Sequence, residues 1–341
     1  MENLLVNKVA AVKEVRQAAE YQKKKQACIL TGLAGSSKPV FFAAADKLLG
    51  GKGSMAFITA SREEIRTYRR ELNYLYPDLP MQELYPVSLP RVQADTQSLE
   101  LQAGRAAALR FLSGEERGIV FITAEALQQK QLRPSGMSGK ALQLAVGEEH
   151  EQRNIAVALL DLGYERTEQV DALGQFCLRG DILDVYPINS STAVRIEWFD
   201  NELDAMRSFD VDTQRSLQTL TSIKIAPLKV DESFSYDADI FEYCAADTMV
   251  VVDEPVHVFS MLEKLDKENK EHASELFGKQ ELIEQLAANG AVLVSALGHS
   301  YLQQLPSLNI PVRAVAPYNK NTNLLVEDLQ NWLAEGITPL I

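Results

Sequence analysis

The stretch from 29 to 39, ILTGLAGSSKP, has the layout of a phosphate-binding loop but lacks two groups that such a loop requires. A working loop, G-x-x-x-x-G-K-[ST], uses glycines for close backbone approach, a lysine for the terminal phosphates and a hydroxyl for Mg²⁺. The retained members are Gly32, Gly35 and Lys38. Ser37 replaces the glycine before the lysine, and Pro39, which has neither a hydroxyl nor an N–H, replaces the hydroxyl residue. We therefore predict a vestigial nucleotide site, although any Gly/Ser turn between a strand and a helix can look similar.

A second stretch, MVVVDEPVH from 249 to 257, has the form of an apolar strand that delivers an aspartate to Mg²⁺ and a glutamate to an attacking water. These acids are Asp253 and Glu254. The simpler interpretation is a buried strand that ends in solvated acids. Together with the degenerate loop, the two acids favour a remnant NTPase site. The alternative is a functioning ATPase that uses an unorthodox loop around Lys38.

The elements around these residues predict a parallel α/β sheet that is interrupted and then resumed. Strands alternate with helices in the first part, as expected for a parallel sheet: strands 28–31, 55–59, 82–85 and 118–123, with helices 40–49, 62–75 and 95–112. After 248 the pattern returns, with strands 248–253, 291–296 and 311–315, a long helical region within 256–289 and a helix over 324–334. The N-terminal 26 residues predict an amphipathic helix.

The interrupting segment predicts a small antiparallel α+β insert. A helix over 149–162 precedes short alternating segments at 174–184, 194–199 and 202–209, with a tight turn at Asp200-Asn201. Period-two alternation places Val194, Ile196 and Trp198 on one face and Arg195, Glu197 and Phe199 on the other. A mixed arginine and aromatic face is typical of protein interfaces, although a solvated face of paired charges looks the same. No nucleophile with a neighbouring base is apparent.

Composition narrows the range of functions. A net charge of −13 argues against a surface that holds nucleic acid through its phosphates. No apolar run approaches the length of a membrane span, and the N-terminus lacks a signal peptide, so we expect a cytoplasmic protein. The three cysteines and four histidines show no metal-ligand spacing, so we expect buried thiols and neither metal nor cofactor.

The insert resembles a known module. Its strings GQFCLRGDILDVYP and VRIEWFDNELDAMRSFD are similar to the UvrA-binding domain of the excision-repair protein UvrB, and still closer to the matching module of bacterial transcription-repair coupling factors (Mfd). GLAGSSKP and VVVDEP fall where UvrB has its nucleotide motifs, and the aromatic damage-probing hairpin of UvrB is missing. The resemblance implies a helicase-like α/β domain in two parts, 1–136 and 227–341, with a UvrA-binding-like insert over 137–226.

The resemblance also implies a function without catalysis in this chain, namely recruitment of UvrA to a stalled RNA polymerase. By matching positions, the UvrA contacts would be Arg166, Phe176, Arg179, Arg195 and Glu197. Cys177 stands where UvrB has an arginine, which would weaken part of the contact. Translocase ATPase, RNA polymerase and DNA contacts would belong to other parts of a longer parent, because the chain stops within an apparent strand at GITPLI. We expect a monomer, and the remaining alternative is direct binding of this chain to damaged DNA.

Overall fold

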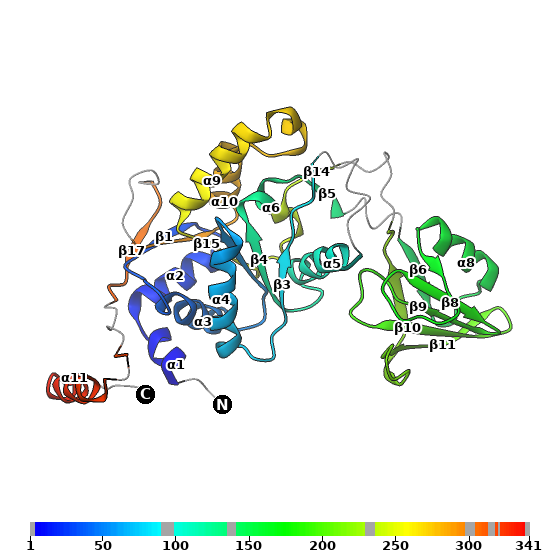
Figure 1. Cartoon of the computed structure of the whole chain (residues 1–341), viewed down its shortest axis with the longest axis horizontal. Coiled ribbons are helices and arrows are strands. Elements are labelled where there is room, and N and C mark those ends of the chain that lie inside the picture. Colours follow the sequence, from blue (N-terminus) through cyan, green and yellow to red (C-terminus); the bar gives the residue numbers. More distant parts are fainter. Residues whose placement is uncertain are drawn as a thin grey trace.

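Two folded units are joined in the computed structural model, which describes residues 4–89, 99–134, 141–228, 236–296, 304–312, 318–319 and 321–337. One unit is a parallel α/β body built from both ends of the chain, and the other is an antiparallel insert (Figure 1). The predicted fold class, a parallel sheet interrupted by an antiparallel α+β insert, is confirmed. The predicted boundary at 136/137 falls outside the described residues.

The body is organised around one parallel sheet of seven strands in the order β17-β1-β16-β15-β2-β4-β3. Strands from before and after the insert are neighbours, since β15 pairs with β2 in parallel, Met249 opposite Met55. The bounds are β1 Cys28–Thr31, β2 Met55–Thr59, β3 Met81–Leu84, β4 Ile119–Thr123, β15 Met249–Asp253, β16 Val292–Ser295 and β17 Ser307–Asn309. The carboxyl ends of β1 and β15, which carry the two degenerate motifs, therefore lie at the same edge with only β16 between them.

Helices cover both faces of this sheet because its strands are apolar on both sides. One face packs against α1 Leu4–Ala10, α2 Lys13–Lys23, α3 Ser37–Leu49 and α4 Arg62–Leu75. The other packs against α5 Leu99–Ser113, α6 Ala124–Gln128, the 3₁₀ helix η2 Ile240–Tyr243, α9 Pro255–Glu268 and α10 Lys279–Ala288. Phe42 and Phe57 anchor the first layer with ring centroids 4.8 Å apart. A second 3₁₀ helix, η3, runs Lys270–Glu275, and β5 Gln131–Leu132 pairs with β14 Tyr236–Ala238.

Three predicted elements need correction. The N-terminal segment is two helices, because Val12 takes an extended conformation between α1 and α2. Helix α3 begins at Ser37 rather than Val40, since a proline in the first turn costs no intrahelical hydrogen bond. In the third, the predicted strand 311–315, the described residues 311–312 are not in a strand, because Pro311 cannot donate to the ladder, and the structure has β17 just before them. Residues 313–315, like residues 95–98 of the predicted helix before Gly114, lie outside the described ranges.

The insert is a six-stranded sheet backed by one helix, α8 Gln152–Asp161. The strand order is β12-β11-β10-β9-β8-β7, and all neighbours are antiparallel except β7 and β8. The bounds are β7 Glu165–Arg166, β8 Gln175–Arg179, β9 Ile182–Val185, β10 Ala193–Phe199, β11 Glu202–Phe209 and β12 Ser216–Leu220. A separate pair, β6 Leu142–Ala145 with β13 Ser222–Ile225, brings the ends of the insert together. This closure explains how a helicase-like sheet accommodates the insert.

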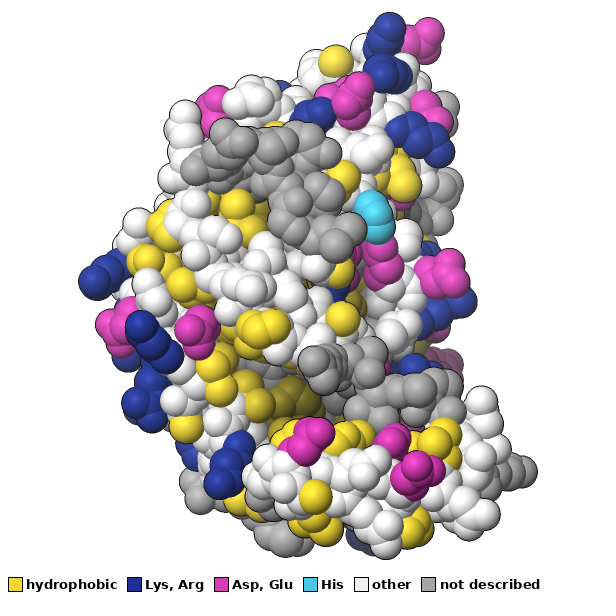
Figure 2. All heavy atoms as spheres, turned by 90° about the vertical axis from the view of Figure 1, so that its left-hand side faces the viewer, with side chains coloured by type: hydrophobic (Ala, Val, Ile, Leu, Met, Phe, Trp, Pro, Cys, Tyr) yellow, Lys and Arg dark blue, Asp and Glu magenta, His cyan; other side chains and the backbone are white. Residues whose placement is uncertain are grey.

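Helix α11, Thr322–Ala334, contributes no buried residue to either unit. Figure 2 shows the face of the molecule that includes this helix, with lysines and arginines intermixed with acids along the margins and apolar side chains between them. In the part of the chain that the structure describes, no helix combines the length and hydropathy of a membrane span.

Candidate functional site

The remnant nucleotide site brings together three of the predicted residues. Lys38 lies in the first turn of α3, and its Nζ donates to Asp253 Oδ1 at 2.6 Å and to Glu254 Oε1 at 2.8 Å. Asp253 ends β15, and Glu254 follows it directly before α9. The side chains of Lys38, Asp253 and Glu254 are 9%, 8% and 20% exposed, so this ion-pair cluster is largely shielded from water.

The charges in this cluster stabilise each other. Burial disfavours the ammonium ion, but attraction to Asp253 and Glu254 outweighs burial and raises the pKa of Lys38. Burial likewise opposes the charge of Glu254, yet its contacts with Lys38, the Ala296 N–H and the Ser295 hydroxyl lower the pKa of Glu254. Both shifts favour the charged forms of Lys38 and Glu254.

The loop that would cradle phosphates makes contacts within the chain instead. Gly32 and Gly35 have positive φ angles of 86° and 53°, as loops of this kind require. A Cβ on Gly32 would lie 2.7 Å from the Ile310 carbonyl oxygen, so this glycine allows the segment after β17 to pack on the loop. Ser37 Oγ donates to the Ala34 carbonyl at 2.8 Å, and Ser36 Oγ donates to Glu71 at 2.9 Å.

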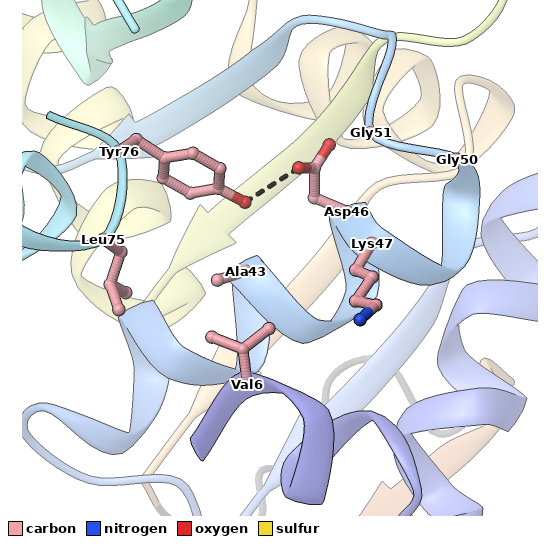
Figure 3. A pocket seen from close by; sticks show the side chains of 8 residues that line it. All are labelled: Val6, Ala43, Asp46, Lys47, Gly50, Gly51, Leu75 and Tyr76. Atoms are coloured by element: carbon pink, nitrogen blue, oxygen red, sulfur yellow. Dashed lines mark hydrogen bonds between the residues drawn. The ribbon is translucent and has the colours of Figure 1, made fainter. Parts of the chain in front are cut away.

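A cavity of about 310 Å³ lies at the other end of α3 (Figure 3). Its most polar group, Asp46, accepts hydrogen bonds from the Tyr76 hydroxyl at 2.8 Å and from Arg117 at 2.7 Å. Asp46 stands eight positions after Lys38, roughly 12 Å along the helix at 1.5 Å per residue. The cavity is thus separate from the remnant nucleotide site.

The insert presents a charged face on the side of its sheet opposite α8. Its centre is Asp184 of β9, which is 2% exposed and accepts two hydrogen bonds from Arg195, at 2.6 Å to Oδ1 and 2.8 Å to Oδ2. Arg179 of β8 reaches Asp184 Oδ2 at 3.3 Å, and Arg195 also stacks on Phe209, 4.7 Å from the ring centroid. Asp184 therefore fixes two of the predicted arginines on one surface.

The predicted alternation along β10 is confirmed. Val194, Ile196 and Trp198 belong to the core of the insert, while Arg195, Glu197 and Phe199 are at least partly exposed. Glu197 pairs with Arg207 of β11, and Phe199 at the β10–β11 turn is 77% exposed. We name this surface, made of Arg179, Ile182, Asp184, Arg195, Glu197 and Arg207, the charged face.

Phe176 requires a correction, because it cannot contact a partner from this surface. Its side chain is fully buried among the core residues of the insert, opposite Val185 of β9. Successive residues of a strand point to opposite faces, so Phe176 supports the sheet from the α8 side. The neighbouring Cys177 lies on the other side, 3% exposed, and its thiol donates to the Glu168 carbonyl at 3.0 Å.

Arg166 is exposed, but the register does not place it with the other arginines. It lies on the edge strand β7 opposite Phe176, and residues paired across a sheet share a face. Arg166 thus lies at the rim of the sheet, on the side that faces α8, and not on the charged face.

Three residues of the charged face, Ile182, Asp184 and Arg207, were not among the predicted contacts. Asp184 in RGDILDVYP was not selected, although the turn at Gly180-Asp181 predicts a hairpin that pairs it with the Arg179 strand. Arg207 lies opposite Arg195 only because a β-bulge at Glu197/Trp198 shifts the register by one residue, so the Asp200-Asn201 turn alone would have placed Met206 there.

Comparison with known proteins gives this surface a family context. Residues 142–230 match the family model described as the UvrB interaction domain. The chain is 36% identical to the transcription-repair-coupling factor of Bacillus subtilis over 203 residues. The aligned region covers 59% of this chain and 17% of that relative. The predicted resemblance is confirmed. It extends to the factors of Staphylococcus haemolyticus, 32% identical over 59% of this chain and 17% of the relative, and Escherichia coli, 28% identical over 48% and 14%.

This chain is therefore similar to transcription-repair-coupling factors and carries a region that matches the UvrB interaction domain. It spans 14% to 17% of the length of the curated relatives described above. The charged face lies wholly within the matched residues, and the remnant nucleotide site lies outside them.

Proposed function

We propose that this chain is a non-catalytic recruitment module that binds UvrA through the charged face of the insert and so brings nucleotide excision repair to stalled RNA polymerase. The observation that carries the proposal is the Asp184-centred arrangement of arginines on a domain that matches the UvrB interaction domain. RNA polymerase and DNA contacts, and ATP-driven translocation, would belong to other parts of a longer parent protein.

The charged face has the chemistry of a specific protein interface. Arg179 keeps 55% of its side chain exposed while its contact with Asp184 restricts it, so it is partly preorganised for a carboxylate on the partner. The largely buried Arg195, 21% exposed, would mainly hold the surface in shape. Glu197 and Arg207 would offer one charge of each sign, which favours a partner with complementary charges over a polyanion.

We expect Phe199 and Ile182 to supply the apolar part of the contact. Both lie beside the charged groups, at 77% and 37% exposure. Arg166, at the rim, would contribute less than Arg179. The module would act as a cytoplasmic monomer, binding one UvrA subunit for each chain.

Calorimetric titration of this chain into purified UvrA tests the proposal. Replacing Arg179→Glu should weaken binding at least about 10-fold, which corresponds to about 1.4 kcal/mol. Arg166→Glu should weaken it less. The matched control is Arg70→Glu on α4, an exposed arginine of the body far along the chain from the insert.

Thermal unfolding of each variant separates loss of contact from loss of fold. Unchanged affinity of the folded Arg179→Glu variant, or equal losses for Arg179→Glu and Arg70→Glu, would reject the charged face as the binding surface. No binding by the intact chain would reject the recruitment function. Titration of Mg²⁺-ATP into this chain alone tests the alternative ATPase function. Binding heat that is present in the wild type and abolished by Lys38→Ala would support that alternative.

A further inference from the structure

The remnant nucleotide site contains its own cation. The ammonium of Lys38 contacts carboxylate oxygens of both Asp253 and Glu254, and all three side chains are at least four-fifths buried. In a working site these two acids would face a divalent metal and the attacking water. We propose that Lys38 is a permanent internal counter-ion that makes the site a structural clasp, and that its removal uncovers a latent divalent-cation site at Asp253 and Glu254.

The clasp joins segments that are far apart in the sequence. Lys38 comes from the first turn of α3, which follows β1, and Asp253 is the last residue of β15. Glu254 accepts hydrogen bonds from the Ala296 N–H at 3.0 Å and the Ser295 hydroxyl at 3.3 Å, at the end of β16. β16 lies between β1 and β15 in the sheet. The contacts therefore tie three adjacent strands at the edge where a nucleotide would otherwise bind.

The backbone of Glu254 gives independent support for a structural role. Its φ and ψ of 40° and 67° lie in the left-handed region, which non-glycine residues rarely adopt and which is unfavourable for them. This conformation turns the chain from β15 into α9, because the Glu254 N–H donates to Val294 at 2.8 Å and its carbonyl accepts from the His257 N–H at 2.8 Å. The side-chain contacts of Glu254 with Lys38, Ser295 and Ala296 hold the residue in that state.

A buried hydroxyl lies next to the clasp and would be a neighbour of an added cation. Tyr68 of α4 is 6% exposed, and its hydroxyl has no hydrogen-bond partner among the described residues. Burial, the charge of Asp253 and its polar interaction with the hydroxyl, and the charges of Glu254 and Glu71 raise the pKa of Tyr68, so its hydroxyl stays neutral beside the acids. Carboxylate and water oxygens are ligands that Mg²⁺ and Mn²⁺ prefer, so the two acids would bind the ion and the Tyr68 hydroxyl would hydrogen-bond to a water on it. With Lys38 in place, its ammonium contacts both carboxylates that would bind the ion.

Replacing Lys38→Ala in the whole chain tests both parts of the proposal. In EDTA, we expect the melting temperature to fall by about 5–10 °C, because two largely buried carboxylates lose their counter-ion. Millimolar MnCl₂ or MgCl₂ should restore at least half of that loss, and the wild-type protein should shift by less than about 1 °C. Adding Glu254→Gln to Lys38→Ala should abolish the cation response. Lys38→Met gives a second variant of similar side-chain length if the alanine variant does not fold.

The outcomes are decisive for the clasp and separable from recruitment. A melting temperature for Lys38→Ala equal to the wild type would overturn the structural role. A variant that is destabilised but insensitive to both cations would overturn the latent cation site, as would a wild-type protein that MgCl₂ stabilises equally. A folded Lys38→Ala variant should still bind UvrA like the wild type, because the clasp lies outside the matched domain.

Discussion

Arg195→Ala should destabilise the insert strongly, because Arg195 is the main counter-ion of a buried acid. Asp184 is 2% exposed and receives hydrogen bonds of 2.6 Å and 2.8 Å from this one guanidinium group. Removal of Arg195 leaves Asp184 with the longer contact to Arg179, at 3.3 Å, and also removes the stacking on Phe209. The proposed binding of UvrA should therefore be lost in this variant mainly through loss of structure.

The expected magnitude follows from these contacts. Breaking a fully buried ion pair costs about 3–5 kcal/mol. Because the Arg195 side chain is 21% exposed and Arg179 remains, we take about 2–3 kcal/mol for the pair, with on the order of 0.5–1 kcal/mol for the lost stacking. For a unit of about 90 residues, a total near 3 kcal/mol lowers the melting temperature by roughly 12–24 °C.

Tryptophan fluorescence can measure this loss in the insert alone. The chain has two tryptophans, Trp198 in the core of the insert and Trp332 on α11. In a Trp332→Phe background, the thermal transition of Trp198 reports the insert. Arg166→Ala is the control, because Arg166 is exposed and lies on an edge strand. A transition for Arg195→Ala within 3 °C of the control would refute the role of Asp184 as a buried hub.

Two further predictions concern the body. The stability that the wild-type protein gains over Lys38→Met should be largest between about pH 5 and pH 10. This stability difference should fall at acid pH, because the lowered pKa of Glu254 gives stability that protonation removes. It should also fall at alkaline pH, because the raised pKa of Lys38 gives stability that deprotonation removes. A difference in unfolding free energy that does not change with pH in urea titrations would contradict the clasp. Gly32→Ala should lower the free energy of unfolding by about 2–3 kcal/mol, because left-handed strain adds to a Cβ placed 2.7 Å from the Ile310 carbonyl. Gly35→Ala, with a similar φ but no neighbour within 4 Å, is the matched control, and equal losses would show that packing on the loop is unimportant.

Hydrophobic periodicity predicted most of the fold because the body strands are short apolar runs between turn residues. Strands 28–31 and 55–59 and helix 62–75 were predicted with the bounds that the structure has. Errors arose where the local pattern was overridden. Pro39 suggested a later start for α3, and β17 at Ser307–Asn309 was not predicted, because the prediction placed the strand after Pro311.

The candidate site was predictable only in part, because a sequence shows residue types and not which groups already have partners. Lys38, Asp253 and Glu254 were grouped correctly from motif order, but the sequence could not show that the lysine contacts both acids. Phe176 was selected because it lies in a motif, although its position in β8 places it in the core. Asp184 pairs with Arg195 on one side and with Cys177 on the other, so Cys177 shares the charged face. The same alternation that predicted the faces of β10 then places Phe176 on the opposite, buried side.

The two sites illustrate the same physical rule with opposite functional consequences. In each, a largely buried carboxylate is retained because an arginine or lysine of the same chain neutralises it: Asp184 by Arg195, and Asp253 by Lys38. Within the part of the chain that the structure describes, Lys38 is the cation that contacts both acids of the remnant nucleotide site, so its charge is already used and is not free for a phosphate. On the charged face, Asp184 also holds Arg179, whose side chain stays more than half exposed. A buried acid that holds a second, exposed cation can present that cation to a partner, whereas an acid pair neutralised by one buried cation stabilises the fold alone.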